Sequence, residues 1–508
     1  MKNKISLINI VTSVFLQIIT IISGLIIPRI ILNSFGSDIN GLISSIQQFL
    51  SYITILEGGL SGVVIANLYK PILEKDNKKI SNIVKTADSF YKKIGFIFLA
   101  YSIILGIIYT FLFKTKYSFN YIFLLTIILS INMFIQYMFS LTYRCLLIAD
   151  KKIYIVSFVQ SIIIIINTII TIIMANNLNN IHLLKLFSGL VYLLQPLVFL
   201  YYINKKYLIA KDGKKDNNFI KERWNAFAIN IAAFIHNSTD ISILTIFTNL
   251  RYVSIYSIYA LVPIAIKQIV SSISSAITPV IGHAYVRNNY NELYFKLDIY
   301  EYIINFLVFF FGSIAILLIT PFVLLYTKGI NDANYNQLVF GYLIIISEMI
   351  YLLKFPHLNL AYSANKFKEI TIPAFIEAIL NLLLSIILVN KFGLIGIAIG
   401  TIIAMIYRLI FQIYYTKVII KREQWKFYSK IIVFTCFSLI GIIICNKKLP
   451  LLEISIINCL IYSIIYSAIF LIIYLIASFI FFKKEINYFI NYIKKEKNTK
   501  WVYLKRKY

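Results

Sequence analysis

Eight ionisable side chains lie inside long apolar stretches of this sequence, where a charge is expensive unless water or protein surrounds it. They are Arg29, Glu57, Asp240, Lys267, Glu348, Lys354, Glu377 and Arg408, and two histidines, His236 and His357, accompany them. Lysine and arginine in a hydrated interior bind anions, and phosphate groups above all. Carboxylates in the same place can bind a proton or a sodium ion. The charges therefore predict a polar path through an apolar protein.

The cations Arg29, Lys267, Lys354 and Arg408 are the candidate substrate-binding residues, together with the polar side chains of Gln47 and Asn237. The carboxylates are the candidates for ion coupling, and they are Glu57, Asp240, Glu348 and Glu377. Structural alternatives stay open. Glu377 and Arg408 suit a buried ion pair, Lys354 can extend to the inner membrane face, and the carboxylates can simply balance the cations. The two histidines are expected to pack between helices rather than to catalyse.

Polar residues recur at helical spacing in four of the apolar segments, which marks a face that is turned away from lipid. Segment 1 carries Asn9, Ser13, Gln17, Thr20 and Gly24. Segment 2 carries Asn40, Ser44, Gln47, Ser51, Thr54, Glu57 and Ser61. Segment 7 carries Asn230, Asn237 and Asp240, and segment 8 carries Tyr256, Tyr259, Lys267, Ser271, Ser274 and Thr278. Hydrogen bonding between neighbouring helices explains any one stripe. Four stripes at matching places favour a shared polar cavity.

The composition assigns the chain to the α-helical membrane proteins. Of its 508 residues, 60% are hydrophobic and only 14% are charged, which leaves too little polar surface for a soluble domain of this length. The apolar runs are continuous, whereas a membrane barrel would show short alternating segments. The net charge of +28 lies in short loops, as membrane topology requires, so nucleic acid is not an expected partner. Four cysteines without CxxC spacing predict neither disulfides nor a metal site, and no cofactor is expected.

Fourteen transmembrane segments can be counted, so the fold class is an all-α polytopic membrane protein. They lie near 8–32, 41–67, 94–113, 119–148, 153–174, 182–203, 224–249, 252–283, 300–326, 336–361, 370–389, 394–418, 430–446 and 455–482. With this count, most lysines and arginines fall in the loops of one side. The positive-inside rule then predicts that both termini are cytoplasmic and that the first segment is retained as an anchor.

The loops suggest a division into two pseudo-symmetric six-helix lobes. Expected parts are an N-terminal lobe 1–203, a basic linker 204–223, a C-terminal lobe 224–418, helices 13 and 14 in 419–482, and a basic tail 483–508. A weak repeat supports the lobes, because the turn at 33–41 resembles that at 249–256. Residues 73–93 predict an amphipathic helix that lies on the inner membrane face. Glycines 58, 59, 62, 393, 396 and 400 predict close backbone contacts, with hinge bending as a second role.

Several short motifs, in their order along the chain, resemble one transporter family. They stand at 27–30 (IPRI), 35–41 (FGSDING), 56–60 (LEGGL), 68–71 (LYKP), 237–240 (NSTD), 253–259 (VSIYSIY), Tyr335 and 392–401 (FGLIGIAIGT). Over roughly residues 5–420 the chain resembles the Wzx-type polysaccharide flippases of the multidrug/oligosaccharidyl-lipid/polysaccharide exporter superfamily. Within it, the likeness is to the branch encoded with capsule and surface-polysaccharide genes.

The resemblance implies two lobes around a cavity lined by segments 1, 2, 7 and 8, in the cytoplasmic membrane. It implies alternating access for an undecaprenyl-diphosphate-linked oligosaccharide in capsule or exopolysaccharide biosynthesis, with membrane lipids, a polysaccharide polymerase and glycosyltransferases as partners. Related lipid II flippases use cavity cations on segments 1, 2 and 8. Arg29 and Lys267 match by segment and type, while segment 2 departs from the pattern because it offers Glu57 and no cation.

Two other functions compete with this one. A multidrug exporter of the same superfamily, coupled to H⁺ or Na⁺, would favour an acidic cavity for cationic drugs, whereas this sequence offers cations. A membrane polymerase or acyltransferase would need catalytic residues, often on a long outer loop. The outer loops are short and no nucleophile–histidine–acid spacing is present, so an enzyme is not expected.

Overall fold

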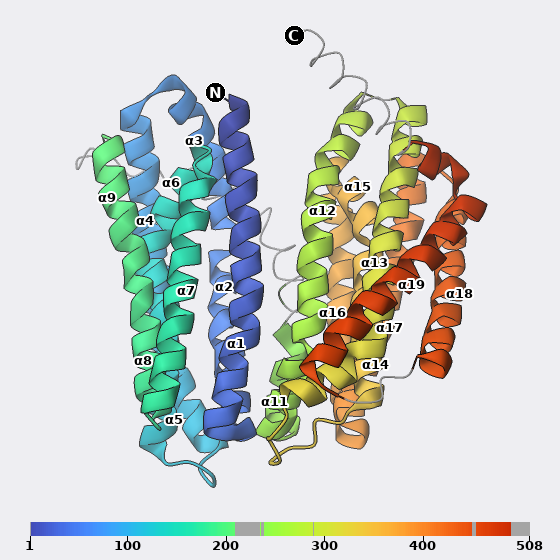
Figure 1. Cartoon of the computed structure of the whole chain (residues 1–508). Coiled ribbons are helices and arrows are strands. Elements are labelled where there is room, and N and C mark those ends of the chain that lie inside the picture. Colours follow the sequence, from blue (N-terminus) through green and yellow to red (C-terminus); the bar gives the residue numbers. More distant parts are fainter. Residues whose placement is uncertain (1, 209–233, 235–237, 288, 450–453, 489–508) are drawn as a thin grey trace, which may run out of the picture. The chain divides into compact units, whose positions relative to one another are not determined.

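The computed structural model describes residues 2–208, 234, 238–287, 289–449 and 454–488, and within them it contains helices and no strands (Figure 1). Twelve described stretches are long and apolar enough to cross a membrane. One of them, Ile8–Glu57, contains two predicted segments, and the shorter apolar helix Ser238–Phe247 lies within the predicted segment 224–249. The chain is therefore a multi-pass α-helical membrane protein, as the sequence predicts.

The chain divides into two compact units. Unit 1 comprises Met1–Ile258 with Gly329–Asn334, and unit 2 comprises Tyr259–Lys328 with Tyr335–Tyr508. The helices of unit 1 are α1 (Lys2–Leu50), α2 (Thr54–Glu57), α3 (Leu60–Glu74), α4 (Asn77–Leu112), α5 (Phe119–Ile135), α6 (Leu141–Ala149), α7 (Ile153–Asn177), α8 (Ile181–Leu190), α9 (Leu194–Lys206), Ser238–Phe247 and α11 (Leu250–Tyr259), whose last residue belongs to unit 2. Those of unit 2 are α12 (Leu261–Val286), α13 (Tyr290–Tyr326), α14 (Leu338–Leu353), α15 (Phe355–Ser363), α16 (Phe367–Phe392), α17 (Leu394–Ile420), α18 (Trp425–Lys448) and α19 (Ile456–Phe481). The predicted linker 204–223 falls mostly outside the described residues.

Helix α1 turns sharply at Gly36, which separates the first two predicted segments. The glycine has φ 80° and ψ 177°, a conformation that side chains disfavour. A Cβ atom there would lie 2.9 Å from a carboxylate oxygen of Asp332. That carboxylate accepts hydrogen bonds from the backbone N–H and the hydroxyl of Ser37, at 2.7 and 2.6 Å. The bend is therefore fixed both by glycine and by the loop Gly329–Asn334.

The prediction that residues 73–93 form a separate helix on the membrane surface is wrong. Residues from Asn77 to Leu112 form the single helix α4, which Asp76 caps by accepting a hydrogen bond from the N–H of Lys79. The apolar stripe that suggested contact with lipid packs against protein instead, and Ala87 and Tyr91 are fully buried. Helices α3 and α6 supply that surface. An amphipathic pattern does not tell whether lipid or protein covers the apolar face.

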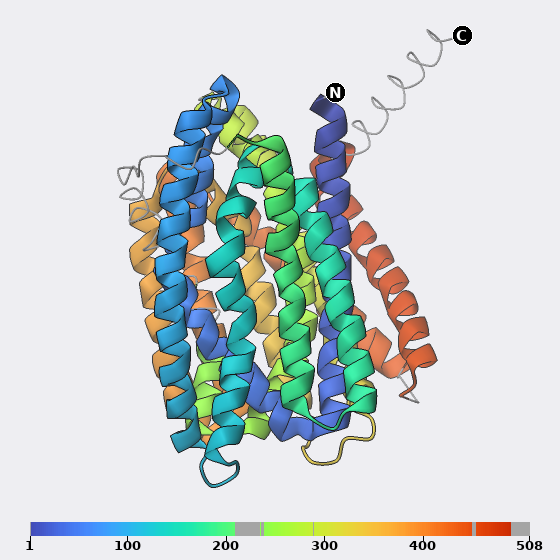
Figure 2. The same cartoon turned by 90° about the vertical axis from the view of Figure 1, so that its left-hand side faces the viewer.

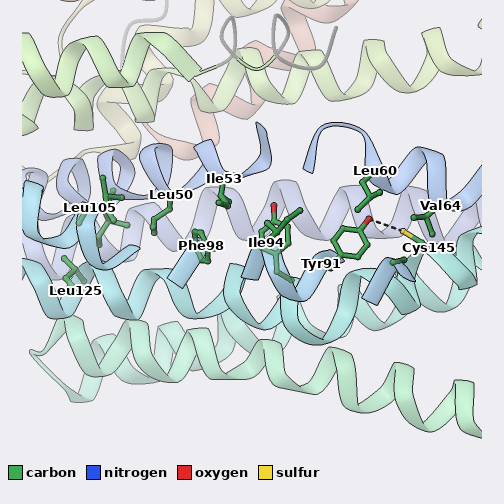
Figure 3. Packing of buried hydrophobic residues seen from close by; sticks show 14 of the residues in the cluster. Leu50, Ile53, Leu60, Val64, Tyr91, Ile94, Phe98, Leu105, Leu125 and Cys145 are labelled. Atoms are coloured by element: carbon green, nitrogen blue, oxygen red, sulfur yellow. Dashed lines mark hydrogen bonds between the residues drawn. The ribbon is translucent and has the colours of Figure 1, made fainter. Parts of the chain in front are cut away.

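The core of unit 1 runs along α1, α3, α4, α5 and α6. Figure 3 shows its packing, in which Leu60 and Val64 of α3 lie beside Tyr91 of α4 and Cys145 of α6. Helix α1 packs against α7 through buried hydroxyls, with Ser23 and Thr168 2.7 Å apart. Figure 2 looks onto α4, α7 and α9 of this unit. Its membrane-spanning helices therefore pack around a continuous apolar interior with a few internal polar pairs.

Helix α13 is the centre of unit 2, because α12, α14, α18 and α19 all pack on it. The last two helices attach through hydroxyls and aromatic rings. The hydroxyl of Tyr474 lies 2.7 Å from both Ser313 and Ser438, and its ring packs against Phe434. Such hydrogen bonds support helix association where the hydrophobic effect between helices is weak. Helices α18 and α19 are thus built into this unit.

Helices α16 and α17 approach closely at two of the predicted glycines. A Cβ atom on Gly396 would overlap the carbonyl oxygen of Leu388, and one on Gly400 would lie 2.7 Å from the hydroxyl of Ser385. The expected close contacts are confirmed here. Gly62 is different, because a Cβ atom added to it would meet no heavy atom within 4 Å in the described part of the chain.

We expect Gly396→Ala to lower the melting temperature of the detergent-purified protein, because the added methyl group forces α16 and α17 apart. Overpacking of this kind costs about 1–3 kcal/mol. Gly24→Ala is the matched control, since a Cβ atom on Gly24 meets nothing within 4 Å in the described structure. Equal melting temperatures for the two variants would contradict the close contact.

Candidate functional site

Unit 2 gathers three of the predicted charges into a buried cluster. Glu377 of α16 lies between two cations, with Lys354 Nζ 3.6 Å from Oε1 and Arg408 Nε 3.3 Å from Oε2. All three side chains are only 5–6% exposed. Arg408 also donates to the carbonyl oxygen of Ile370 at 2.9 Å. The structural alternative of a Glu377–Arg408 pair is therefore realised, and Lys354 joins that pair instead of extending to the membrane surface.

Tyr351 extends this cluster to Lys267. Its ring lies between two ammonium groups, 4.1 Å from Lys267 Nζ and 3.9 Å from Lys354 Nζ, as in a cation–π contact. Glu348, one helical turn earlier, is within electrostatic reach of both lysines. One of its carboxylate oxygens is buried without a hydrogen-bond partner in the described structure. Three cations therefore face two carboxylates, so the fully ionised cluster carries one net positive charge.

A pocket lined by hydroxyl groups continues along the same face of α12. Ser271 follows Lys267 by one helical turn, and Ser274 and Thr278 follow in register. They line a space of about 390 Å³ together with Phe355, Leu358 and Asn359 of α15. Asn359 donates to the hydroxyl of Ser274 at 2.9 Å. Three residues of the polar stripe predicted for segment 8, Ser271, Ser274 and Thr278, therefore line a pocket in this unit.

We expect Glu377→Gln to destabilise unit 2 strongly, because it leaves Lys354 and Arg408 buried without their shared counter-charge. Breaking a buried ion pair on one side costs about 3–5 kcal/mol. Thermal unfolding in detergent measures the effect. Glu369→Gln on the same helix is the control, because Glu369 pairs with Lys366 where both side chains are 42% exposed. Such surface pairs contribute about 0–1 kcal/mol. The cluster has no stabilising role if the two variants melt alike.

In unit 1 the candidate Glu57 ends the short helix α2 at a break in the second segment. Gly58 and Gly59 are both left-handed, with φ 53° and 79°, and helix α3 starts after them. The continuous segment expected at 41–67 is therefore interrupted. These two glycines break the helix instead of allowing close contact with a neighbouring helix. Ser61 donates a hydrogen bond to the Glu57 carboxylate and also contacts Tyr91 Oη at 2.8 Å.

This break opens into a pocket of about 370 Å³ inside unit 1. Beside Glu57 and Ser61 it is lined by Gln136, in a π-helical turn, and by Arg144 and Cys145 of α6. A carboxylate and a guanidinium group thus line one pocket of unit 1. Arg144 supplies the cation that the sequence did not assign to this part of the chain.

A second feature of unit 1 is the tight contact of α1 with the helix Ser238–Phe247 and α11. A Cβ atom on Gly41 would overlap the carbonyl oxygen of Leu250, so only glycine fits. The Asn40 amide donates to Ser254 at 2.8 Å, and the hydroxyls of Ser45 and Thr245 lie 2.6 Å apart. At the end of this contact Asp38 binds Lys116 at 2.6 Å and Arg251 at 3.4 Å. The turns at 33–41 and 249–256, which resemble each other in sequence, are therefore in contact, and their helices pack tightly here.

The remaining candidates are not gathered into a common cluster by the described contacts. Arg29 follows Pro28 in α1 and is half-buried, and Gln47 is exposed. Asp240 accepts a hydrogen bond from Tyr256 Oη at 2.8 Å. Asn237 and His236 lie outside the described residues. The stripe of segment 1 is partly used for helix packing, because Asn9 donates to the carbonyl oxygen of Lys151 at 2.9 Å.

Sequence reasoning missed three features of these sites. Arg144 stands near the end of segment 4 and resembles a loop residue, although its position a full turn before that end is a usable signal. Tyr351 carries no charge and is one of 38 tyrosines, so nothing in the sequence singles it out. Glu301 lies inside segment 9 and belongs with the buried charges. It pairs with Arg422 at 2.7 Å.

The chain matches no protein-family model and no curated protein sequence. Its fold is similar to those of solved transporters. The lipid II flippase MurJ, in an inward closed conformation, aligns over 94% of this chain and 100% of its own, with 18% identity and a TM-score of 0.72. The MATE multidrug transporter DinF-BH aligns over 83% and 96%, with 16% identity and a TM-score of 0.60. An inward-facing MATE family transporter of the MOP superfamily aligns over 80% and 96%, with 15% identity and a TM-score of 0.57.

All three of these proteins are transporters, and each aligns over nearly its whole length. Structural similarity at sequence identities below 20% establishes the fold but does not identify the substrate. The resemblance that the motifs indicate is confirmed at this level: the chain is a multi-pass membrane protein with the fold shared by the MurJ flippase and the MATE transporters.

Proposed function

We propose that this chain is a flippase that moves an undecaprenyl-diphosphate-linked oligosaccharide across the cytoplasmic membrane. The observation that carries the proposal is the net-positive cluster of Lys267, Lys354 and Arg408 at membrane depth, next to a pocket of hydroxyl groups. A diphosphate needs a cationic partner when it leaves water. Sugars need hydroxyl and amide groups to replace their hydration.

The head group would bind along α12. Lys267 is half-buried and is the most accessible cation of the cluster, so it would meet the phosphate, while Lys354 and Arg408 stay buried and raise the local positive potential. Ser271 and Thr278, one and three turns further along the helix, offer hydrogen bonds to the sugar. In unit 1, the pocket with Arg144 and Gln136 offers a guanidinium and an amide group beside the carboxylate of Glu57.

The lipid tail would lie in an apolar groove of unit 2. A space of about 420 Å³ is lined by Ile266 of α12, by Phe311 and Leu318 of α13, and by Leu460 of α19, with other apolar side chains around them. Such a surface suits polyprenyl chains, because burial of apolar area is favourable and needs no specific partner. Ile266 adjoins Lys267 in sequence, so groove and cluster start from neighbouring residues of α12.

Transport would proceed by alternating access, with the contact of α1 at Gly41 and Ser45 as the closed outer gate. Two states that differ by a few kcal/mol suffice for such a cycle. For a coupling proton, Glu348 is the best-suited carboxylate, because it has a buried oxygen without a hydrogen-bond partner and, unlike Glu377, forms no ion pair within 4.0 Å in the described structure. Glu377 serves as the counter-ion of Lys354 and Arg408. Glu57 and Asp240 already accept hydrogen bonds from Ser61 and Tyr256.

The orientation follows from the basic loops, which put both termini in the cytoplasm. The product would then feed capsule or exopolysaccharide assembly, between the glycosyltransferases that build the repeat unit and the polymerase that joins it. A multidrug exporter of this fold would need an acidic site for cationic drugs, which the net-positive cluster does not offer.

Deletion of the gene tests this proposal. Lipid-linked repeat units are expected to accumulate on the inner leaflet, and surface polysaccharide is expected to disappear. The wild-type gene should restore both. If the deletion strain exports polysaccharide normally but becomes sensitive to cationic drugs, the chain is a multidrug exporter and the proposal is wrong.

A further inference from the structure

Unit 2 contains another charged cavity, which the transport site does not use. It has a volume of about 370 Å³ and lies between the start of α13, the start of α18 and the end of α19. All three helices are membrane spans that begin or end here. The cavity therefore lies at the level of the lipid head groups. We call it the basic pocket, and it is lined by Phe295, Asp298, Lys426, Ser429, Lys430 and residues 480–485.

The acidic groups at the inner end of the basic pocket already form ion pairs with buried cations. Arg422 binds Glu301 through two bonds of 2.7 and 3.0 Å and reaches Asp298 at 2.5 Å. Lys430, only 2% exposed, lies 3.1 Å from Asp298 and 3.0 Å from Glu301. Burial alone would lower the pKa of Arg422, but the charges of Glu301 and Asp298 outweigh it and raise that pKa above its ordinary value. This network is electrically balanced and fixes the position of the pocket.

The rim, by contrast, has an excess of positive charge. Lys426 is 70% exposed and lies 3.6 Å from the already paired Asp298. Lys483 and Lys484 are exposed, and no described carboxylate lies within 4.0 Å of either ammonium group. The carboxylate of Glu485 is the only acidic group that the pocket-lining residues add at the rim in the described structure. Three lysines thus face one carboxylate.

The outer wall of the basic pocket is apolar. Ile480 and Phe481 at the end of α19 are 56% and 55% exposed, on a helix that is apolar enough to face lipid, and Phe295 is 41% exposed. A soluble anion would gain nothing from this wall. A phospholipid would place its phosphate among the lysines and its acyl chains along the wall.

We propose that the basic pocket binds the phosphate head group of an anionic phospholipid, separately from the transported substrate. Basic pockets between membrane helices bind such head groups through charge-assisted hydrogen bonds. Binding would join α13, α18 and α19 at the membrane surface. The inference does not depend on the proposed flippase activity, because it concerns a resident lipid.

Native mass spectrometry of the purified full-length protein tests the proposal with phosphatidylglycerol and phosphatidylcholine. We expect Lys483→Gln/Lys484→Gln to weaken phosphatidylglycerol binding by about 25-fold, since each basic residue near a membrane surface adds about fivefold to affinity for anionic lipid. Binding of phosphatidylcholine should not change. Lys447→Gln/Lys448→Gln is the matched control, because it neutralises an exposed lysine pair at the opposite end of α18 and should bind like wild type.

A photoactivatable phosphatidylglycerol locates the site. Crosslinked peptides should contain residues 480–485, and an excess of inorganic phosphate should not prevent the reaction. Crosslinks only elsewhere, or equal losses in the two lysine-pair variants, would overturn the proposal in favour of diffuse attraction by a basic protein. Full competition by inorganic phosphate would also overturn it, because the pocket would then be a site for small anions.

Discussion

A chain that carries Ser45→Cys and Thr245→Cys is expected to lose transport completely on oxidation and to regain it on reduction. The two hydroxyl oxygens lie 2.6 Å apart, and both side chains are at most 5% exposed. A disulfide has a sulfur–sulfur distance of about 2.05 Å, so two cysteines fit this place with a small adjustment. The bond would lock α1 to the helix Ser238–Phe247. If this contact is the outer gate, the locked protein cannot open it.

The experiment needs a background without the native cysteines, which are Cys145, Cys436, Cys445 and Cys459. Ser44→Cys with Thr245→Cys is the control, because Ser44 lies on another face of α1 and should not crosslink. Crosslinking is scored by gel mobility, and transport by the rate of lipid translocation. Undiminished translocation by a fully crosslinked sample would show that the contact is static, and the gate would have to be placed elsewhere.

Lys267→Ala is expected to reduce translocation by roughly tenfold to a hundredfold at normal protein level. A hydrogen bond to a charged group is worth about 1.5–3 kcal/mol, and Lys267 is the partly exposed cation of the cluster. Lys267→Arg should keep a large part of the activity, because it retains the charge. Lys391→Ala, at an exposed lysine of α16, should transport like wild type. Translocation in proteoliposomes, normalised to inserted protein, is the measurement.

The same loss is expected for Arg29→Ala, with Arg287→Ala at an exposed arginine as its control. Arg29 belongs to unit 1, so its variant tests a cation of the other unit independently. If both Arg29→Ala and Lys267→Ala transport at the wild-type rate, neither residue belongs to the substrate path.

Most helix positions could be predicted from the sequence, because a backbone in lipid must satisfy its own hydrogen bonds and apolar length alone then defines a span. Two errors have a physical cause. Residues 77–93 look amphipathic, yet α4 continues into the next span because no residue stops it, and unit 1 covers its apolar face. The break at Gly58 and Gly59 depends on backbone angles that the glycine pair permits but does not require.

The sequence indicates which residues belong to the charged cluster of unit 2, but not how they are arranged. Lys354, Glu377 and Arg408 are conspicuous because each interrupts an apolar run. The distance between Glu377 and Arg408 depends on how α16 packs against α17, and these helices approach closely at Gly396 and Gly400. The position of Lys354 depends on the junction of α14 and α15. Single-residue reasoning also cannot place Tyr351 between two lysines, since tyrosine is common in every part of this chain.

Translocation in vesicles that contain only the purified full-length chain tests the proposed flippase activity most directly. A fluorescent undecaprenyl-diphosphate oligosaccharide is incorporated in both leaflets, and an added glycosidase reports the molecules that reach the outer one. Cleavage is expected to proceed beyond the initially accessible fraction, at a rate that rises with protein content and falls in the oxidised Ser45→Cys/Thr245→Cys chain. Cleavage that stops at the level of protein-free vesicles would contradict the proposed activity.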